Sequence, residues 1–268
     1  QRTIDFPVHL FANVGDDSEH PDTLAYVRDV AMPYAAQHGI EFVELRHIRR
    51  DGEEETLYKK LMRPGSRSTG IPIFLEGAGA PGRRSCTSEF KIRRIAIWQR
   101  RNGANAGWPA VTGLGISWDE SHRMRLESGI SSQVLEYPLI DLRLRRSDCV
   151  KIIQEVGLPV PPKSSCWFCP YHSKVTWHRL KVDRPELFEK AVELEKTLSD
   201  RSEFLLGRGK VFLNRELRSI DKVIGNQMDL FPPVQRAEIE QLQRALKDHE
   251  AYMASTDDDH CESGYCHT

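Results

Sequence analysis

The chain has 268 residues, of which 39% are hydrophobic and 29% are charged. Its 38 lysines and arginines against 39 aspartates and glutamates give a formal net charge of −1, which argues against a globally basic nucleic-acid binder but leaves room for local basic patches. Six cysteines in a chain of this length do not form a disulfide scaffold, which favours the cytoplasm. No apolar run is long enough to span a bilayer, so we expect no membrane partner.

Short apolar runs alternate along the chain with segments of helical periodicity. The predicted strands are 6–14, 40–45, 110–116 and 134–142, and the predicted helices are 23–37, 90–101, 147–156, 185–198 and 234–253, with a helical turn or two at 56–62. Residues 64–84 are rich in Gly, Pro and Ser and predict a long loop. This alternation predicts an α/β fold in which a mostly parallel sheet carries helices on both faces and binds ligands at the carboxyl ends of its strands. We expect a nucleotide-binding α/β domain over residues 1–160 and a helical C-terminal lobe over 161–268.

The sequence Ser-Cys-Trp-Phe-Cys-Pro-Tyr-His at residues 165–172 is the strongest chemical signal in the chain. Two thiols three positions apart can reach one metal ion or cluster from a single turn, and the following proline stiffens the backbone that holds them. A redox dithiol, or two buried cysteines that act as small apolar residues, are the alternatives. Because Cys86, Cys261 and Cys266 also lie in segments rich in turn-forming or polar residues, we favour a shared iron–sulfur cluster, of the 4Fe–4S type, with zinc as the alternative.

The expected metal ligands are Cys86, Cys166, Cys169 and Cys266. Cys261 is left as the catalytic nucleophile or resolving thiol, and the roles of Cys261 and Cys266 can be exchanged because the chemistry does not separate them. His172, three residues after Cys169, is a further candidate ligand, although a histidine hydrogen-bonded within its loop is the preferred interpretation.

Polar residues follow two of the predicted strands. The candidate nucleotide-binding residues are Asn13, Gly15, Asp16 and Asp17 after the first strand, Lys91 in the basic helix at 90–101, and Arg123 after the strand at 110–116. The two cations are expected to face phosphates, since charged donors make strong hydrogen bonds to phosphate oxygens. For Arg123, a surface ion pair with Asp119 or Glu120 is the alternative.

Several short motifs, in this order along the chain, resemble the phosphoadenosine-phosphosulfate (PAPS) reductase group. That group belongs to the adenine nucleotide α-hydrolase, or PP-loop, superfamily. The matching segments are Asn13-Val14-Gly15 with residues 21–27, Cys86-Thr87 with Lys91-Ile92, Thr112-Gly113 with Asp119-Glu120-Ser121 and Arg123, and Tyr137-Pro138-Leu139 with Asp148-Cys149-Val150. The resemblance covers roughly residues 4–172. It implies an adenine-nucleotide site at the edge of a parallel sheet.

Three departures from the family pattern refine this resemblance. The family's Ser-Gly-Gly-rich phosphate loop is absent, and because the chain opens on Gln1 and enters a predicted strand at once, we expect the first strand and that loop to lie upstream. A single Cys86 stands where the iron–sulfur reductases carry a double cysteine, which looks more like the sulfur-inserting relatives, including the DNA phosphorothioation enzymes. The C-terminal Cys261 and Cys266 also differ from the reductases' Glu-Cys-Gly tail.

The resemblance and the cysteine pattern together imply sulfur-transfer chemistry. ATP converts a poor leaving group of an acceptor into AMP, and a sulfur nucleophile then displaces it. The implied cofactors are ATP or a related adenine nucleotide, Mg²⁺ as a candidate and the iron–sulfur cluster; the implied partners are a sulfur donor or reductant protein and, as a candidate acceptor, nucleic acid. A sulfonucleotide reductase with a C-terminal catalytic cysteine and a non-catalytic zinc-stabilised nucleotide-binding module are the alternatives.

Overall fold

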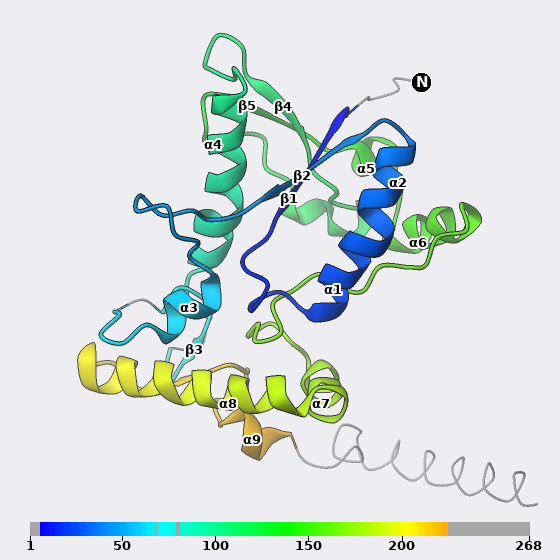
Figure 1. The fold of residues 1–268 in the computed structure, drawn as a ribbon. Helices are drawn as coiled ribbons and strands as arrows, with labels where there is room; N and C mark the ends of the chain where they lie inside the picture. The colour runs from blue at the N-terminus through cyan, green and yellow to red at the C-terminus, as the bar shows by residue number, and fades with distance from the viewer. Residues whose placement is uncertain (1–5, 68, 79–80, 225–268) are drawn as a thin grey trace, which may run out of the picture.

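The computed structural model describes residues 6–67, 69–78 and 81–224 and shows a mixed α/β fold (Figure 1). Its strands form three two-stranded sheets rather than one continuous sheet. The pairs are β1 (Val8–Ala12) with β2 (Glu41–Leu45), parallel; β4 (Ala110–Gly113) with β5 (Gln133–Glu136), parallel; and β3 (Phe74–Leu75) with β6 (Val211–Phe212), antiparallel. The predicted α/β class and parallel pairing are therefore confirmed, as two separate parallel pairs.

Strands β1 and β2 lie between helix α4 (Arg93–Arg101) on one side and the α1–α2 rod on the other (Figure 1). The rod comprises α1 (Pro21–Tyr26), a π-helical segment η1 (Val27–Ala31) and α2 (Met32–Gln37), and it confirms the helix predicted at 23–37. The helix widens into η1 just before Pro33, which has no N–H to donate and whose ring clashes with the carbonyl four residues earlier. Gly39, with φ of +66°, follows the end of the rod.

The middle of the chain forms helix α3 and the helix that ends in α4. Helix α3 (Leu57–Met62) begins at Thr56, whose hydroxyl accepts the N–H of Lys59, and it confirms the predicted turn at 56–62. A π-helical segment η2 (Thr87–Ile92) runs directly into α4, so the helix predicted at 90–101 begins three residues earlier than expected.

The strand predicted at 134–142 is wrong in its second half. Strand β5 ends at Glu136, and helix α5 (Pro138–Asp141) follows at once. Proline's fixed φ suits the first turn of a helix, so Pro138 stops the strand that the apolar run around it suggests. The 3₁₀ turn η3 (Trp118–Arg123) and helix α6 (Arg146–Glu155) complete this part of the chain, and α6 confirms the helix predicted at 147–156.

The hydrophobic core lies mainly beneath the C-terminal helices. These are α7 (Lys174–Asp183), which the sequence did not predict, α8 (Pro185–Asp200), which confirms the helix at 185–198, and the short segments η4 (Arg201–Leu205) and α9 (Ile220–Val223). One buried cluster contains Val14, Leu61 and Phe90 together with Trp167 and Leu194, so it draws on both sides of residue 160. The helix predicted at 234–253 lies outside the described residues.

The first strand is less buried than predicted. Ala12 is the only buried residue of β1, and Leu45 is the only buried residue of β2. The sheet is only two strands wide, and no further strand of the described chain pairs with either of its edges. The two parallel pairs meet where the ring of Phe6, just before β1, packs against Gly113 at the end of β4; a Cβ at Gly113 would come within 2.5 Å of that ring. None of the helices in the described ranges has both the length and the apolarity to cross a membrane.

Replacing Glu195 with alanine should destabilise the fold. Its buried carboxylate accepts the backbone N–H of Leu213 at 2.7 Å and that of Ile220 at 2.9 Å. Removing the carboxylate leaves two buried donors without partners, at about 1–3 kcal/mol each. Urea unfolding should therefore give a free energy of unfolding lower by about 2–5 kcal/mol. Glu189→Ala, at an exposed position of the same helix, is the matched control; equal losses for the two variants would contradict this assignment.

Candidate functional site

The turn between Cys166 and Cys169 is anchored by the two aromatic residues between the thiols. Trp167 and Phe168 are 2% and 0% exposed and pack edge to face, with ring centroids 4.7 Å apart. The N–H of Cys169 donates to the carbonyl of Cys166 at 3.1 Å, which closes the turn. Apolar burial therefore fixes the backbone that carries the two sulfurs.

The loop after β1 is joined to this turn by a short antiparallel bridge. Trp167 N–H donates to the carbonyl of Ser18 at 3.3 Å, and His20 N–H donates to that of Ser165 at 3.1 Å. The indole N–H of Trp167 also donates to the carbonyl of Asp17 at 2.9 Å. These bonds place the carboxyl end of β1 directly against the cysteine motif.

Cys86 lies within electrostatic reach of the same turn, and its place in a shared metal site stays a prediction. It caps η2, its N–H donates to the carbonyl of Gly70 at 2.8 Å, and it packs against the same buried cluster as Cys166. Burial raises the pKa of Cys166 well above its usual value, and the nearby charges of Glu19, Cys169 and Cys86 raise it further, whereas Lys91 lowers it. The three thiols thus lie within electrostatic reach of one another.

The three sulfurs do not all lie within 4.8 Å of one another. Of the residues that the structure describes, His47, Glu55 and Glu89 are the group of three whose ligand atoms all lie within 4.8 Å of one another, and the three sulfurs do not form such a group. A zinc ion with bonds of about 2.3 Å to sulfur would draw its thiolates closer than that limit.

His172 supports the motif instead of extending its ligand set through Nε2. That nitrogen is 2.9 Å from the carbonyl of Cys166, and the ring packs edge to face on Trp177 at 5.1 Å. Burial lowers the pKa of His172 to about 4, so the ring is neutral at neutral pH and donates to the carbonyl. This agrees with the preferred sequence interpretation of a histidine hydrogen-bonded in its loop.

A buried carboxylate that sequence reasoning missed lies beside the thiols. Glu19 is 0% exposed, and Lys91 Nζ lies 3.5 Å from its Oε1. In sequence, Glu19 stands in the polar run that follows the first strand and predicts a nucleotide-binding loop, and nothing local signals that this glutamate points inward. It pairs with the distant Cys166 in an antiparallel bridge.

The predicted nucleotide loop is held by its own hydrogen bonds. Asn13 is buried, donates to Asp16 and Glu44, and accepts the N–H of Gly15. Asp17 accepts the hydroxyls of Ser18 and Thr56, both at 2.8 Å.

Two features of this loop decide which parts can meet a ligand. Gly15 has φ of +125°, and a Cβ there would lie 2.4 Å from that of Thr56, so only glycine fits. The Asp16 carboxylate, 61% exposed and paired with Arg46, is the most open group of the four predicted residues.

Arg123 is paired with Glu120 at 2.7 Å, the alternative that the sequence analysis kept open. It follows β4, whose end at Gly113 lies against Phe6 and so at the opposite end of β1 from the Asn13–Asp17 loop. Its convergence with that loop stays a prediction. The predicted ligand Cys266 and nucleophile Cys261 lie outside the described residues.

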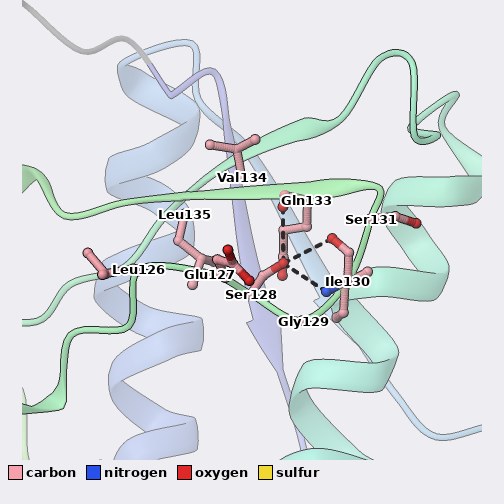
Figure 2. A pocket seen from close by; sticks show the side chains of 9 residues that line it. All are labelled: Leu126, Glu127, Ser128, Gly129, Ile130, Ser131, Gln133, Val134 and Leu135. Atoms are coloured by element: carbon pink, nitrogen blue, oxygen red, sulfur yellow. Dashed lines mark hydrogen bonds between the residues drawn. The ribbon is translucent and has the colours of Figure 1, made fainter.

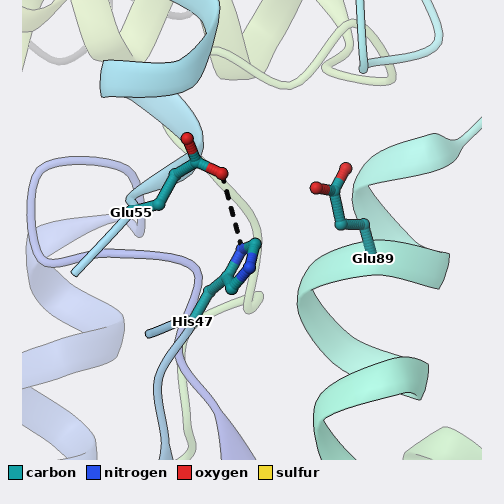
Figure 3. A group of neighbouring side chains, drawn as sticks. All are labelled: His47, Glu55 and Glu89. Atoms are coloured by element: carbon teal, nitrogen blue, oxygen red, sulfur yellow. Dashed lines mark ion pairs between the residues drawn. The ribbon is translucent and has the colours of Figure 1, made fainter. Parts of the chain in front are cut away.

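The group formed by His47, Glu55 and Glu89 is an ion-pair network (Figure 3). Arg63 pairs with Glu55 and Lys60 pairs with Glu89, so both carboxylates already hold cations. Burial lowers the pKa of His47, and the neighbouring Arg94 lowers it further. A divalent ion here would have to displace or face these cations, so we assign the group no metal.

Two pockets are candidate ligand sites. A pocket of about 330 Å³ is lined by residues 126–135, where the Ser128 hydroxyl is occupied by Ile130 and Gln133 (Figure 2). Glu127 is the one charged residue among those that line it, so the pocket offers no cluster of acidic or basic side chains. A second pocket, of about 380 Å³, opens beside the cysteine motif, and its wall includes Lys163, His172 and Arg179. The second is therefore better placed for chemistry at the motif.

Comparison with known proteins gives no relative: no protein-family model, curated protein or solved structure matches the chain. The family resemblance therefore rests on its motifs and stays a prediction.

The buried neutral His172 should make the metal-free, full-length chain sensitive to acid. The unfolded chain takes up this proton near pH 6.5, whereas the folded chain resists it until about 4. Stability is therefore fully present above about 6.5 and is lost as pH falls toward 4, by an amount on the order of 3 kcal/mol. Urea unfolding between pH 7 and 4.5 should show a shallower loss for His172→Gln than for the wild type.

His122→Gln, at an exposed histidine, controls for the loss of an imidazole as such. Parallel pH profiles for the wild type and His172→Gln would contradict the assignment.

Proposed function

We propose that this chain is an adenine-nucleotide-dependent enzyme of sulfur transfer whose cysteine site holds an iron–sulfur cluster. The observation that carries the proposal is the placement of Cys86, from the start of η2, beside the Cys166–Cys169 turn that lies far along the chain. Distant cysteines rarely gather around one buried point without a shared ligand, and soft thiolates select iron–sulfur clusters, zinc or copper(I).

The residues present fit such a cluster. Three thiols from two segments offer the donor set, which suits an iron–sulfur cluster and, as the alternative, zinc. Such a cluster, when bound, would bring inorganic sulfide next to the nucleotide loop. The chain's own contribution is to hold the thiols in a buried turn and to shield them from water through Trp167 and Phe168.

The nucleotide half of the proposal rests on position. The Asn13–Asp17 loop follows a parallel strand at its carboxyl end, which is where open α/β sheets bind ligands. Lys91 lies between the cysteine motif and solvent, since its side chain is 37% exposed and its charge still reaches the Cys166 thiol. A nucleotide phosphate that approached Lys91 would therefore sit next to the sulfur site.

The same helical segment favours a polyanionic acceptor. Arg93, Arg100 and Arg101 are exposed along α4, which continues the helix that carries Lys91. Exposed arginines on one helix make sequence-independent contacts to phosphates. Nucleic acid is therefore the acceptor that we propose.

Metal analysis of anaerobically purified protein tests the cluster. We expect about four irons and four sulfides per chain, as a 4Fe–4S cluster requires. Cys86→Ser, Cys166→Ser and Cys169→Ser should each lower the iron content, because each removes a thiolate. Cys149→Ser, at a cysteine of α6, is the matched control and should keep it. Zinc without sulfide would make this a zinc site, and a metal-free wild type would contradict the proposal.

Removing the Lys91 charge tests the nucleotide position. Lys91→Ala should weaken the binding of ATP by about 1.5–3 kcal/mol, the usual contribution of a charge-assisted contact. Isothermal calorimetry with ATP gives the dissociation constants. Arg93→Ala, two residues later and exposed, controls for a general loss of positive charge from the helix. Equal affinities for Lys91→Ala and the wild type would move the phosphates elsewhere.

A further inference from the structure

The carboxylate of Glu19 is buried without a hydrogen bond. Its side chain is 0% exposed, and neither Oε1 nor Oε2 has a hydrogen-bond partner in the described chain. Burying an ionised carboxylate without partners costs several kcal/mol. A fold that keeps such a group ionised therefore needs a cation beside it.

Lys91 does not meet that need alone. Its Nζ lies 3.5 Å from Glu19 Oε1, which is longer than the 2.7–2.9 Å of a charge-assisted hydrogen bond. The lysine side chain is 37% exposed, so water competes for its ammonium group. Oε2 remains without a hydrogen-bond partner even when this ion pair is counted.

The backbone aims Glu19 at the cysteine motif. Glu19 and Cys166 are directly opposite in the antiparallel bridge, and the hydrogen bonds run between their neighbours on either side, from Trp167 to Ser18 and from His20 to Ser165. In such a pair, the two Cα atoms are about 4.5 Å apart and both side chains leave the same face. The carboxylate and the thiol therefore emerge side by side.

We infer that Glu19 is the oxygen ligand that completes the site formed by Cys86, Cys166 and Cys169. This inference rests on the proposed function, in which those thiols bind an iron–sulfur cluster. The metal is the missing cation: it neutralises the carboxylate in a pocket that offers no hydrogen bonds, and it binds oxygen as well as sulfur. The ligand set is then three thiolates and one carboxylate, all from residues that the bridge and η2 bring together.

The test uses the full-length chain, reconstituted anaerobically with ferrous iron and sulfide. Glu19→Gln keeps the shape of the side chain but offers a poor ligand, so iron should be lost to a chelator about 10-fold faster or more than from the wild type, since even changes outside the ligand set cost 10–100-fold. Electron paramagnetic resonance should also show a changed spectrum of the reduced cluster. Glu189→Gln, at an exposed glutamate, is the matched control and should behave as the wild type.

A second comparison separates a ligand from a counter-ion. If Glu19 served only to balance Lys91, the double variant Glu19→Gln with Lys91→Gln would regain wild-type iron retention. A ligand cannot be rescued in this way, so we expect the double variant to lose iron as fast as Glu19→Gln. Wild-type retention in either the single or the double variant overturns the inference. Glu19→Asp, which keeps the charge but withdraws it by one methylene, replaces Glu19→Gln if that variant does not fold.

Two further arms distinguish this inference from the proposed function. Cys266→Ser examines the other candidate for the fourth ligand: rapid iron loss there, with slow loss from Glu19→Gln, would overturn our assignment while leaving the cluster intact. Titration with Co²⁺ reports a site even where no cluster forms, because thiolate ligation gives a charge-transfer absorption. Weaker Co²⁺ binding by Glu19→Gln supports the carboxylate ligand without the cluster, and a wild type that binds neither iron nor Co²⁺ overturns both proposals.

Discussion

The antiparallel bridge between Glu19 and Cys166 is the contact on which the site depends. Its flanking hydrogen bonds join the loop after β1 to a turn that lies almost 150 residues later, and the indole of Trp167 adds a third bond to the same loop. The ion pair between Arg184 and Asp22 is a further link between the start of α1 and the C-terminal helices. Because the bridge is short, its geometry is maintained by the burial of Trp167 and Phe168 beneath it.

This arrangement explains why the polar loop is so heavily bonded. The side chain of Asn13 accepts a hydrogen bond from the loop backbone, and those of Asp17 and Ser18 accept hydrogen bonds from the start of α3. These bonds fix the loop without a ligand. A loop fixed in this way presents Glu19 in one direction only. Preorganisation of this kind is what a binding site needs, because a ligand then does not have to order the loop when it binds.

Much of the fold could be predicted from the periodicity of apolar residues, and each wrong prediction has a local cause in the sequence. The helix at 185–198 has a regular apolar stripe behind Pro185, and the structure places α8 there. By contrast, the run around Pro138 was taken as strand, because short apolar segments do not distinguish the two periods. Helix α7 was missed because its polar and apolar residues show little amphipathic pattern. The convergence of the three thiols stays a prediction that rests on their shared chemistry, whereas Glu19 could not be found because it pairs with a distant segment.

The charges at the site differ between its empty and its metal-loaded state. Without a metal, burial raises the pKa of the Cys166 and Cys169 thiols, and Lys91 lies beside Glu19 as its counter-ion. A cluster core of charge about +2 held by three thiolates and one carboxylate carries a net charge of about −2, and Lys91 reduces it to about −1, which a buried site tolerates better. Binding of the metal therefore releases the thiol protons. Because fewer protons have to be displaced at higher pH, metal affinity must rise with pH. Lys91 then has two partners in turn: it is a loose counter-ion of Glu19 in the empty site, and its partly exposed ammonium group is free to meet an anion once the metal holds the carboxylate.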